Sequence, residues 1–87
     1  MSITALRTTA LTISDRDTRD DIVDVIEWAR EDANQSFTDG AEYSVAEEDK
    51  RALTYLADIL CGGNDGLQRG TPYATIAAWF RANDFSF

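Results

Sequence analysis

Between residues 18 and 34, apolar side chains recur at the spacing of an α-helix, and this repeat constrains the fold more than any other feature of the chain. At 100° per residue, one face of that helix collects Ile22, Val25, Ile26, Ala29 and Ala33, with Trp28 at its edge. Thr18 and Asp21 resemble the capping box that opens a helix. Ser14 and Asp17 offer the same signal one turn earlier. The repeat therefore predicts a helix over residues 18–34 whose apolar face lies in a core.

A second helix is predicted over residues 45–61. Ser44 is followed three residues later by Glu47, which completes a capping box, and Tyr43 just before it can pack onto the first turns. The apolar positions keep helical spacing and are Ala52, Leu53, Leu56, Ile59 and Leu60, bordered by Tyr55. The two glycines after residue 61 can adopt left-handed conformations, so they are expected to end the helix.

A third helix is predicted over residues 72–83. Thr71 is placed as its N-cap and Pro72 as its first residue, where a missing amide hydrogen costs nothing. Asn83 can close the helix, which leaves residues 84–87 as a short tail. The expected core face is formed by Tyr73, Ile76, Ala77 and Phe80, with Trp79 beside it.

The N-terminal residues 1–14 show no clean period. Ile3, Leu6 and Ala10 suit a helix, whereas residues 11–13 suit a short extended segment. We therefore expect an N-terminal arm that is irregular or contains a short strand. Together these patterns predict an all-α fold, in which the whole chain forms one compact three-helix domain with that arm.

Negative charge is concentrated in one block of the chain. The sequence has 16 Asp and Glu residues against 8 Lys and Arg, a formal net charge of −8. Residues 15–49 hold thirteen of these acids and only three arginines, whereas residues 1–14 and residues 50–87 each carry a net charge of +1. Affinity for phosphates comes largely from Lys and Arg, so this composition disfavours direct binding of DNA or RNA. It favours a basic protein partner, such as a nucleic-acid-binding protein or complex.

A column of carboxylates is predicted on the first of the three helices. Its members are Asp20, Asp24, Glu27 and Glu31, at spacings of four, three and four residues. These positions lie opposite the apolar face, with neighbours roughly 5–6 Å apart. Successive phosphates of a nucleic acid are spaced on a similar scale, so the column can mimic their charge. Among residues on the same helix, only Arg30 is expected to relieve the repulsion between these acids.

A second acidic group opens the next helix and consists of Glu47, Glu48 and Asp49. Helix capping accounts for part of this group, because acids favour the first turn of a helix. Both acidic groups are candidate partner-binding residues. The alternative is that they form an ordinary solvated outer face.

No residue pattern indicates catalysis, a metal or a cofactor. The chain lacks His, which is the usual base of nucleophilic sites. Four aspartates cluster near residue 18, but their spacing fails the EF-hand pattern and helix capping explains them more simply; they are Asp15, Asp17, Asp20 and Asp21. The Gly-rich residues 61–70 lack the Lys-Ser/Thr ending of a phosphate-binding loop. We therefore expect a non-enzymatic protein without metal or cofactor.

Cys61 is the only cysteine, which excludes an internal disulfide and fits a reducing compartment. It follows Ile59 and Leu60, so we expect a buried or half-buried packing thiol. No stretch approaches the roughly 20 apolar residues of a membrane span, and no leader pattern opens the chain. The expectation is a cytoplasmic protein without a membrane partner, located in the host cytoplasm if a phage encodes it.

Three functions remain open. The first is an acidic inhibitor that covers a basic nucleic-acid-binding surface; it resembles small phage proteins that disarm bacterial defence, including anti-CRISPR proteins, in size, charge and lack of catalytic residues alone. The second is a structural or regulatory homo-oligomer whose subunit contacts are Trp28, Trp79, Phe85 and Phe87. The third is a small-nucleotide sponge that uses Arg69, Arg81 and Tyr73 around the Gly-rich loop.

Overall fold

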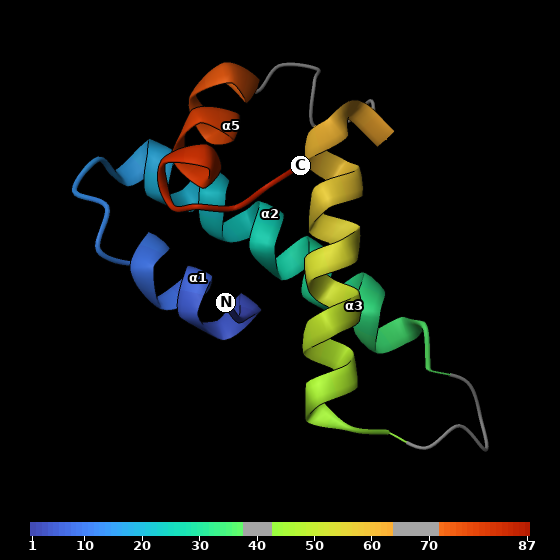
Figure 1. Ribbon diagram of the computed structural model, residues 1–87. Helices are drawn as coiled ribbons and strands as arrows, with labels where there is room; N and C mark the ends of the chain where they lie inside the picture. The colour runs from blue at the N-terminus through green and yellow to red at the C-terminus, as the bar shows by residue number, and fades with distance from the viewer. Residues whose placement is uncertain (38–42, 64–71) are drawn as a thin grey trace.

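A long central helix organises the fold of this protein, which we describe from a computed structural model covering residues 1–37, 43–63 and 72–87. This helix, α2, spans Arg16–Gln35 and packs against each of the other three α-helices (Figure 1). Its buried residues are Ile22, Val25, Ile26, Ala29 and Ala33, which are the predicted core face. The predicted helix 18–34 is therefore confirmed, with two further residues at its start and one at its end.

The N-cap of α2 is Asp15 rather than the expected Thr18 or Ser14. The Asp15 carboxylate accepts a hydrogen bond from the Thr18 N–H at 2.9 Å. Sequence reasoning placed the cap on a hydroxyl residue, but the Asp15 carboxylate accepts the same backbone bond.

The second predicted helix is α3, which spans Val45–Asp58 and continues into a π-helical turn, η1, over Ile59–Gly63. Ser44 is its N-cap as predicted, because its hydroxyl accepts from the Glu47 N–H at 3.0 Å. Gly62 adopts φ 91°, the left-handed conformation expected where this helix ends. Cys61 is exposed, contrary to the expected packing thiol, since Ile59 and Leu60 occupy the buried positions of the turn.

Helix α5 spans Tyr73–Ala82 and lies on α2. The expected N-cap at Thr71 lies outside the described residues, and Pro72 itself precedes the first helical residue. The C-terminal residues are not a loose tail. Asp84 turns the chain with φ 63°, the Phe85 N–H donates to the Phe80 carbonyl at 3.0 Å, and the two phenyl rings pack 5.8 Å apart. This arrangement is a Schellman motif, and it buries Phe85 in the core.

The N-terminal segment forms a helix, which corrects the expected irregular or short-strand arm. Helix α1 spans Ile3–Ala10 and buries Ile3, Leu6 and Ala10 against α2 and α3. Its N-terminus is held by two side chains: the Ser2 hydroxyl accepts from the Ala5 N–H at 3.0 Å, and the Asp49 carboxylate of α3 accepts from the Ile3 N–H at 2.8 Å. Threonine has a low helix propensity, and tertiary packing overrides it here.

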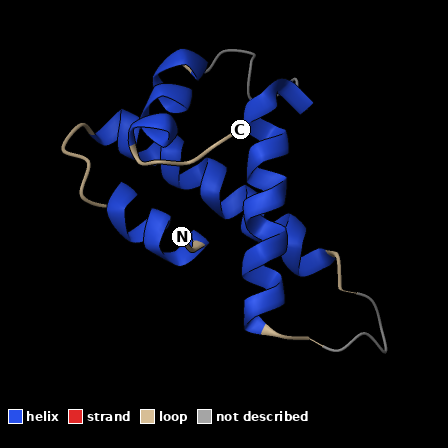
Figure 2. Cartoon of the chain, in the orientation of Figure 1, coloured by secondary structure: helices blue, strands red, loops and turns tan. Residues whose placement is uncertain are grey.

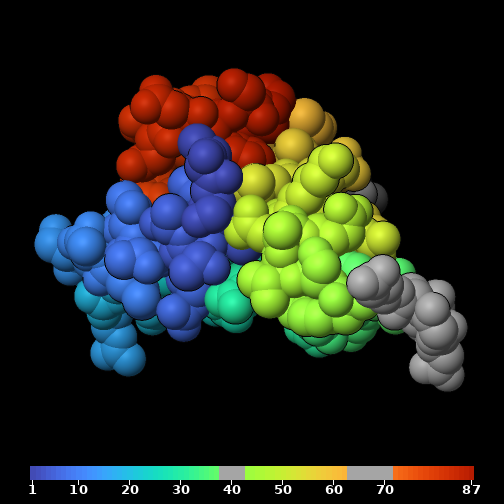
Figure 3. Space-filling model, turned by 60° about the horizontal axis from the view of Figure 1, so that its bottom comes forward, coloured from blue at the N-terminus to red at the C-terminus, as the bar shows by residue number. Residues whose placement is uncertain are grey.

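The all-α fold class is confirmed, with four α-helices instead of three and no strand among the described residues (Figure 2). The space-filling view shows α1, α3 and the C-terminal segment meeting on one face (Figure 3). In the described parts of the chain, none of the helices combines the length and apolar character of a membrane span.

Candidate functional site

The four members of the predicted carboxylate column are exposed to solvent along α2. They are Asp20, Asp24, Glu27 and Glu31. The opposite face of the same helix contains residues of the core. The structure therefore leaves the column uncovered by the described elements, as the helical spacing requires.

Among the described residues, three arginines contact this column, whereas the sequence pattern predicted only one. Glu27 accepts hydrogen bonds from the Arg7 Nε of α1 and from the Arg30 Nη1, the latter at 3.2 Å. The Arg16 Nε lies 3.8 Å from the Asp20 carboxylate. These groups are well exposed, so each pair contributes little to stability. They lower the repulsion within the column and leave Asp24 and Glu31 as its members with no ion pair among the described residues.

Arg7 was not anticipated as a partner of Glu27 because α1 was not predicted to be a helix. Once Ile3, Leu6 and Ala10 pack inward, Arg7 lies on the half-exposed side of α1 next to α2. Its contact with Glu27 spans twenty residues of sequence. No local spacing rule connects positions that far apart.

The three acids that open α3 have different roles and do not form one cluster. Glu47 contributes its N–H to the Ser44 cap, and its carboxylate accepts from the Arg51 Nε at 3.4 Å. Asp49 holds the first amide of α1, as described above. Glu48 reaches α2, where it accepts from the Asn34 Nδ2 at 2.9 Å. Of the three predicted candidates, Glu48 alone extends the acidic surface of α2.

A shallow depression joins the C-terminal half of the column to α3. It is lined by Glu27, Arg30, Glu31, Asn34 and Glu48. Three carboxylates and one guanidinium give this depression a negative balance. We name it the acidic depression; together with the exposed Asp20 and Asp24 of α2 it makes up the candidate acidic surface.

Tyr43 directly precedes the Ser44 cap of α3, near Glu48 of the acidic depression. Hydrogen bonding to Glu48 raises the pKa of the Tyr43 phenol above its usual value, because the nearby carboxylate disfavours the phenolate; Arg30 acts in the opposite direction. The Tyr43 side chain is 52% exposed, and its ring meets the Phe37 ring edge-on at 5.2 Å. Tyr43 was expected to pack onto the first turns of α3; the ring contact that the structure describes for it is with Phe37.

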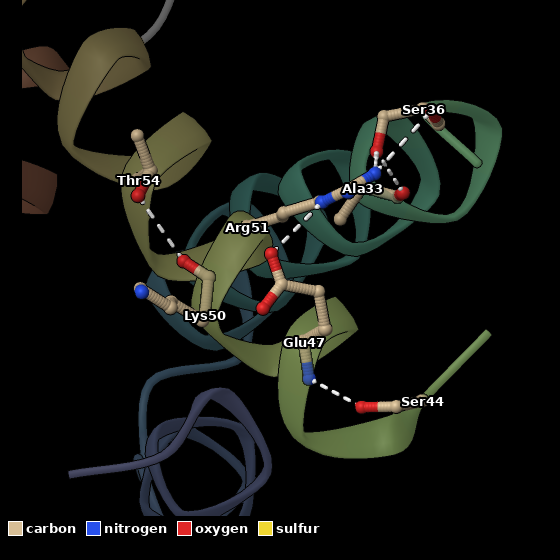
Figure 4. A network of polar contacts seen from close by, with 7 residues as sticks. All are labelled: Ala33, Ser36, Ser44, Glu47, Lys50, Arg51 and Thr54. Carbon is tan, nitrogen blue, oxygen red and sulfur yellow. Dashed lines mark hydrogen bonds and ion pairs between the residues drawn. The ribbon is translucent and has the colours of Figure 1, made fainter. Parts of the chain in front are cut away.

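A second hollow lies where the C-terminus of α2 meets α3, and Arg51 fixes this junction. The Arg51 Nη1 donates to the Ser36 hydroxyl at 2.9 Å and to the Ser36 carbonyl at 3.4 Å (Figure 4). Its guanidinium also lies 4.1 Å over the Phe37 ring. The hollow is lined by Ser36, Glu47, Lys50, Arg51, Thr54 and Tyr55. Because Arg51 bonds the carbonyl of Ser36, the C-cap of α2, and also bonds to Glu47, the described contacts of this junction serve the fold.

The residues expected at subunit contacts are largely packed within the chain itself. Phe85 is 6% exposed and belongs to the core, so it is not presented to a second subunit. Trp28 and Trp79 are half-buried against that core, and Phe87 lies under the Arg81 guanidinium at 4.4 Å from its ring centroid. The aromatic residues therefore form no exposed cluster of their own.

The residues expected for a nucleotide sponge are not assembled into a site by the described contacts. Arg69 and most of the Gly-rich loop lie outside the described residues. Arg81 stacks on Phe87, and the Tyr73 hydroxyl donates to the Leu60 carbonyl, so both side chains are used within the fold.

Comparison of the chain with protein-family models, curated proteins and solved structures finds no match. The function must therefore be argued from the acidic surface and its geometry.

Proposed function

We propose that this protein is a non-enzymatic binding protein whose acidic surface covers a basic, nucleic-acid-binding surface of another protein. The observation that carries the proposal is the exposed column of Asp20, Asp24, Glu27 and Glu31, extended across to α3 by Glu48. A surface of this kind can occupy a groove that normally receives phosphates, and it would do so by charge complementarity.

The placement of the acids supports a binding role over a purely solvated face. Asp15, Asp49 and Glu47 take part in caps or a helix-to-helix contact, and the fold explains them. The column is explained by the fold only in part. Glu27 pairs with Arg7 of α1 and with Arg30, but Asp24 and Glu31 have no ion pair among the described residues, and like charges one turn apart cost a few tenths of a kcal/mol per pair. A role in binding would explain why these carboxylates are placed together on one face of α2.

Small size, acidity and the lack of a catalytic constellation are shared with phage inhibitors of bacterial defence systems such as anti-CRISPR proteins. By this analogy, we propose that the target is a nucleic-acid-binding protein or complex in a bacterial cytoplasm. The partner would bind nucleic acid and this protein at the same surface, so the two would exclude one another.

Affinity capture from a bacterial lysate tests the proposal. The wild type should retain a basic nucleic-acid-binding protein at low salt, release it at high salt, and release it when the nucleic acid of that protein is added. A variant with Asp20→Asn, Asp24→Asn, Glu27→Gln and Glu31→Gln should fold but retain none of it. A matched control carries Asn at positions 21, 32, 58 and 84 in place of Asp, so it loses the same charge outside the column. Equal capture by all three proteins, or capture that nucleic acid does not compete, would overturn the proposal.

A further inference from the structure

Two of the most exposed large apolar side chains stand at the start of α3, shortly before Glu48 of the acidic depression. Val45 is 73% exposed and Tyr43 is 52% exposed, and they flank the Ser44 cap at the start of α3. Isolated apolar residues are common on protein surfaces and need no explanation. Two such side chains within three residues, close to a charged depression, form a small apolar patch rather than isolated exposed residues.

Contacts around the tyrosine fix its position relative to the carboxylates. Glu48, which lines the acidic depression, stands in the first turn of α3 and raises the pKa of the Tyr43 phenol. The Tyr43 ring packs edge-on against Phe37, which Arg51 covers. The Tyr43 ring therefore lies against Phe37, just beyond the C-terminus of α2, at the start of α3.

An apolar patch near carboxylates has the composition of a protein interface. An exposed aromatic residue provides a large contact area at a low cost in conformational entropy, and charged groups around it provide specificity. The face of a tyrosine ring also attracts a cation, as the neighbouring carboxylates do. The occupant that satisfies both features is a segment with a Lys or Arg directly beside an apolar side chain.

We propose that Tyr43 and Val45 form an apolar docking site next to the acidic depression, and that it receives a basic protein segment in which apolar and cationic side chains alternate. The inference rests on the proposed function and narrows it, because a surface that mimicked phosphates alone would need only cations from its partner. The cation enters the depression between Glu27, Glu31 and Glu48, and the apolar neighbour covers Tyr43 and Val45.

Two synthetic peptides of equal length and charge test the inference by calorimetry, one alternating Lys with Leu and the other Lys with Ser. The wild type should bind the Lys-Leu peptide roughly tenfold more tightly, as expected for partial burial of apolar anchors. A Tyr43→Ser, Val45→Ser double variant should lose this advantage and keep its affinity for the Lys-Ser peptide. The advantage should persist at high salt, where charge contacts are screened.

Two control variants separate the apolar contact from other effects. Leu11→Ser removes a side chain of similar exposure, 49%, in the segment that leads away from α1, and it should change neither affinity. Tyr43→Phe keeps the ring but removes its hydroxyl, and it should keep most of the preference for the Lys-Leu peptide. Circular dichroism should show unchanged helix content in all variants, because the altered side chains lie outside the core.

The outcomes distinguish this inference from the function on which it rests. Equal affinity for the two peptides would overturn the apolar docking site and leave the proposed charge-based function intact. Failure of both peptides to bind would overturn both. If sedimentation shows a wild-type dimer that the Tyr43→Ser, Val45→Ser variant converts to a monomer, a second copy of the chain occupies this site and the inference is wrong.

Discussion

The two faces of α2 have different roles. One face places Ile22, Val25 and Ile26 in the core, where they are 4% exposed or less, and the other places four carboxylates in solvent. The apolar face determines how the other helices pack, whereas the acidic face contributes little to folding and is the candidate binding surface. Substitutions on the apolar face should therefore lower stability, whereas substitutions on the acidic face should weaken binding.

Truncation on the apolar face gives the largest expected effect. Ile26→Ala should lower the free energy of unfolding by about 2–5 kcal/mol, because the side chain is fully buried and leaves a cavity. Asp24→Asn, two residues earlier on the acidic face, should change it by less than about 0.5 kcal/mol. Chemical denaturation of both variants measures the difference. If the two substitutions destabilise the protein equally, the division of α2 into a folding face and a binding face is wrong.

The acids at the start of α3 also have two different roles. Asp49 stabilises the fold, whereas its neighbour Glu48 extends the acidic surface. Asp49→Ala removes the acceptor of the Ile3 N–H and should destabilise the protein by about 1–2 kcal/mol. Hydrogen exchange should accelerate first at the amides of α1. Asp49→Asn retains an acceptor oxygen and should restore part of the protection. Glu48→Ala should leave α1 protected, and faster exchange in α1 for this variant would contradict the assignment.

The fold was predictable from the sequence wherever local signals agreed. In α2 and α3, apolar residues recur at helical spacing for several turns and polar residues cap the first turn, so position and buried face followed directly. Helix α1 lacks that agreement. Its threonines favour extended structure, and its first amide is satisfied by Asp49, which lies 46 residues away in sequence. A helix that depends on such a distant partner leaves little local trace.

The candidate site was predictable to the same extent. The column follows from spacing along one helix. The acidic depression does not, because it requires Glu48 of α3 to lie beside Glu31 of α2, and the contact between Arg7 and Glu27 requires α1 to be in place. Phe85 was expected in a short tail and at a subunit contact, because its burial depends on the reversal at Asp84. A left-handed aspartate after a helix is uncommon enough that sequence alone gives no reason to expect it.

The smallest expected effect concerns Asp15, an acid of α2 that serves the fold at the end of the helix and not on the binding face. Hydrogen bonding from Thr18 lowers the pKa of Asp15 below its ordinary value. A carboxylate with a lowered pKa in the folded state stabilises the protein above its unfolded pKa of about 3.9, and this contribution is lost as the pH falls through the lower, folded value.

Asp15→Asn keeps a capping oxygen that does not titrate. The acid side of its curve of stability against pH should therefore be shallower than in the wild type, as measured by thermal unfolding between neutral and strongly acidic pH. Asp24→Asn makes the same change in charge on the binding face and so separates the loss of a cap from the loss of a charge. Identical acid limbs for the wild type and Asp15→Asn would show that the carboxylate at the cap contributes no more to folding than those of the column.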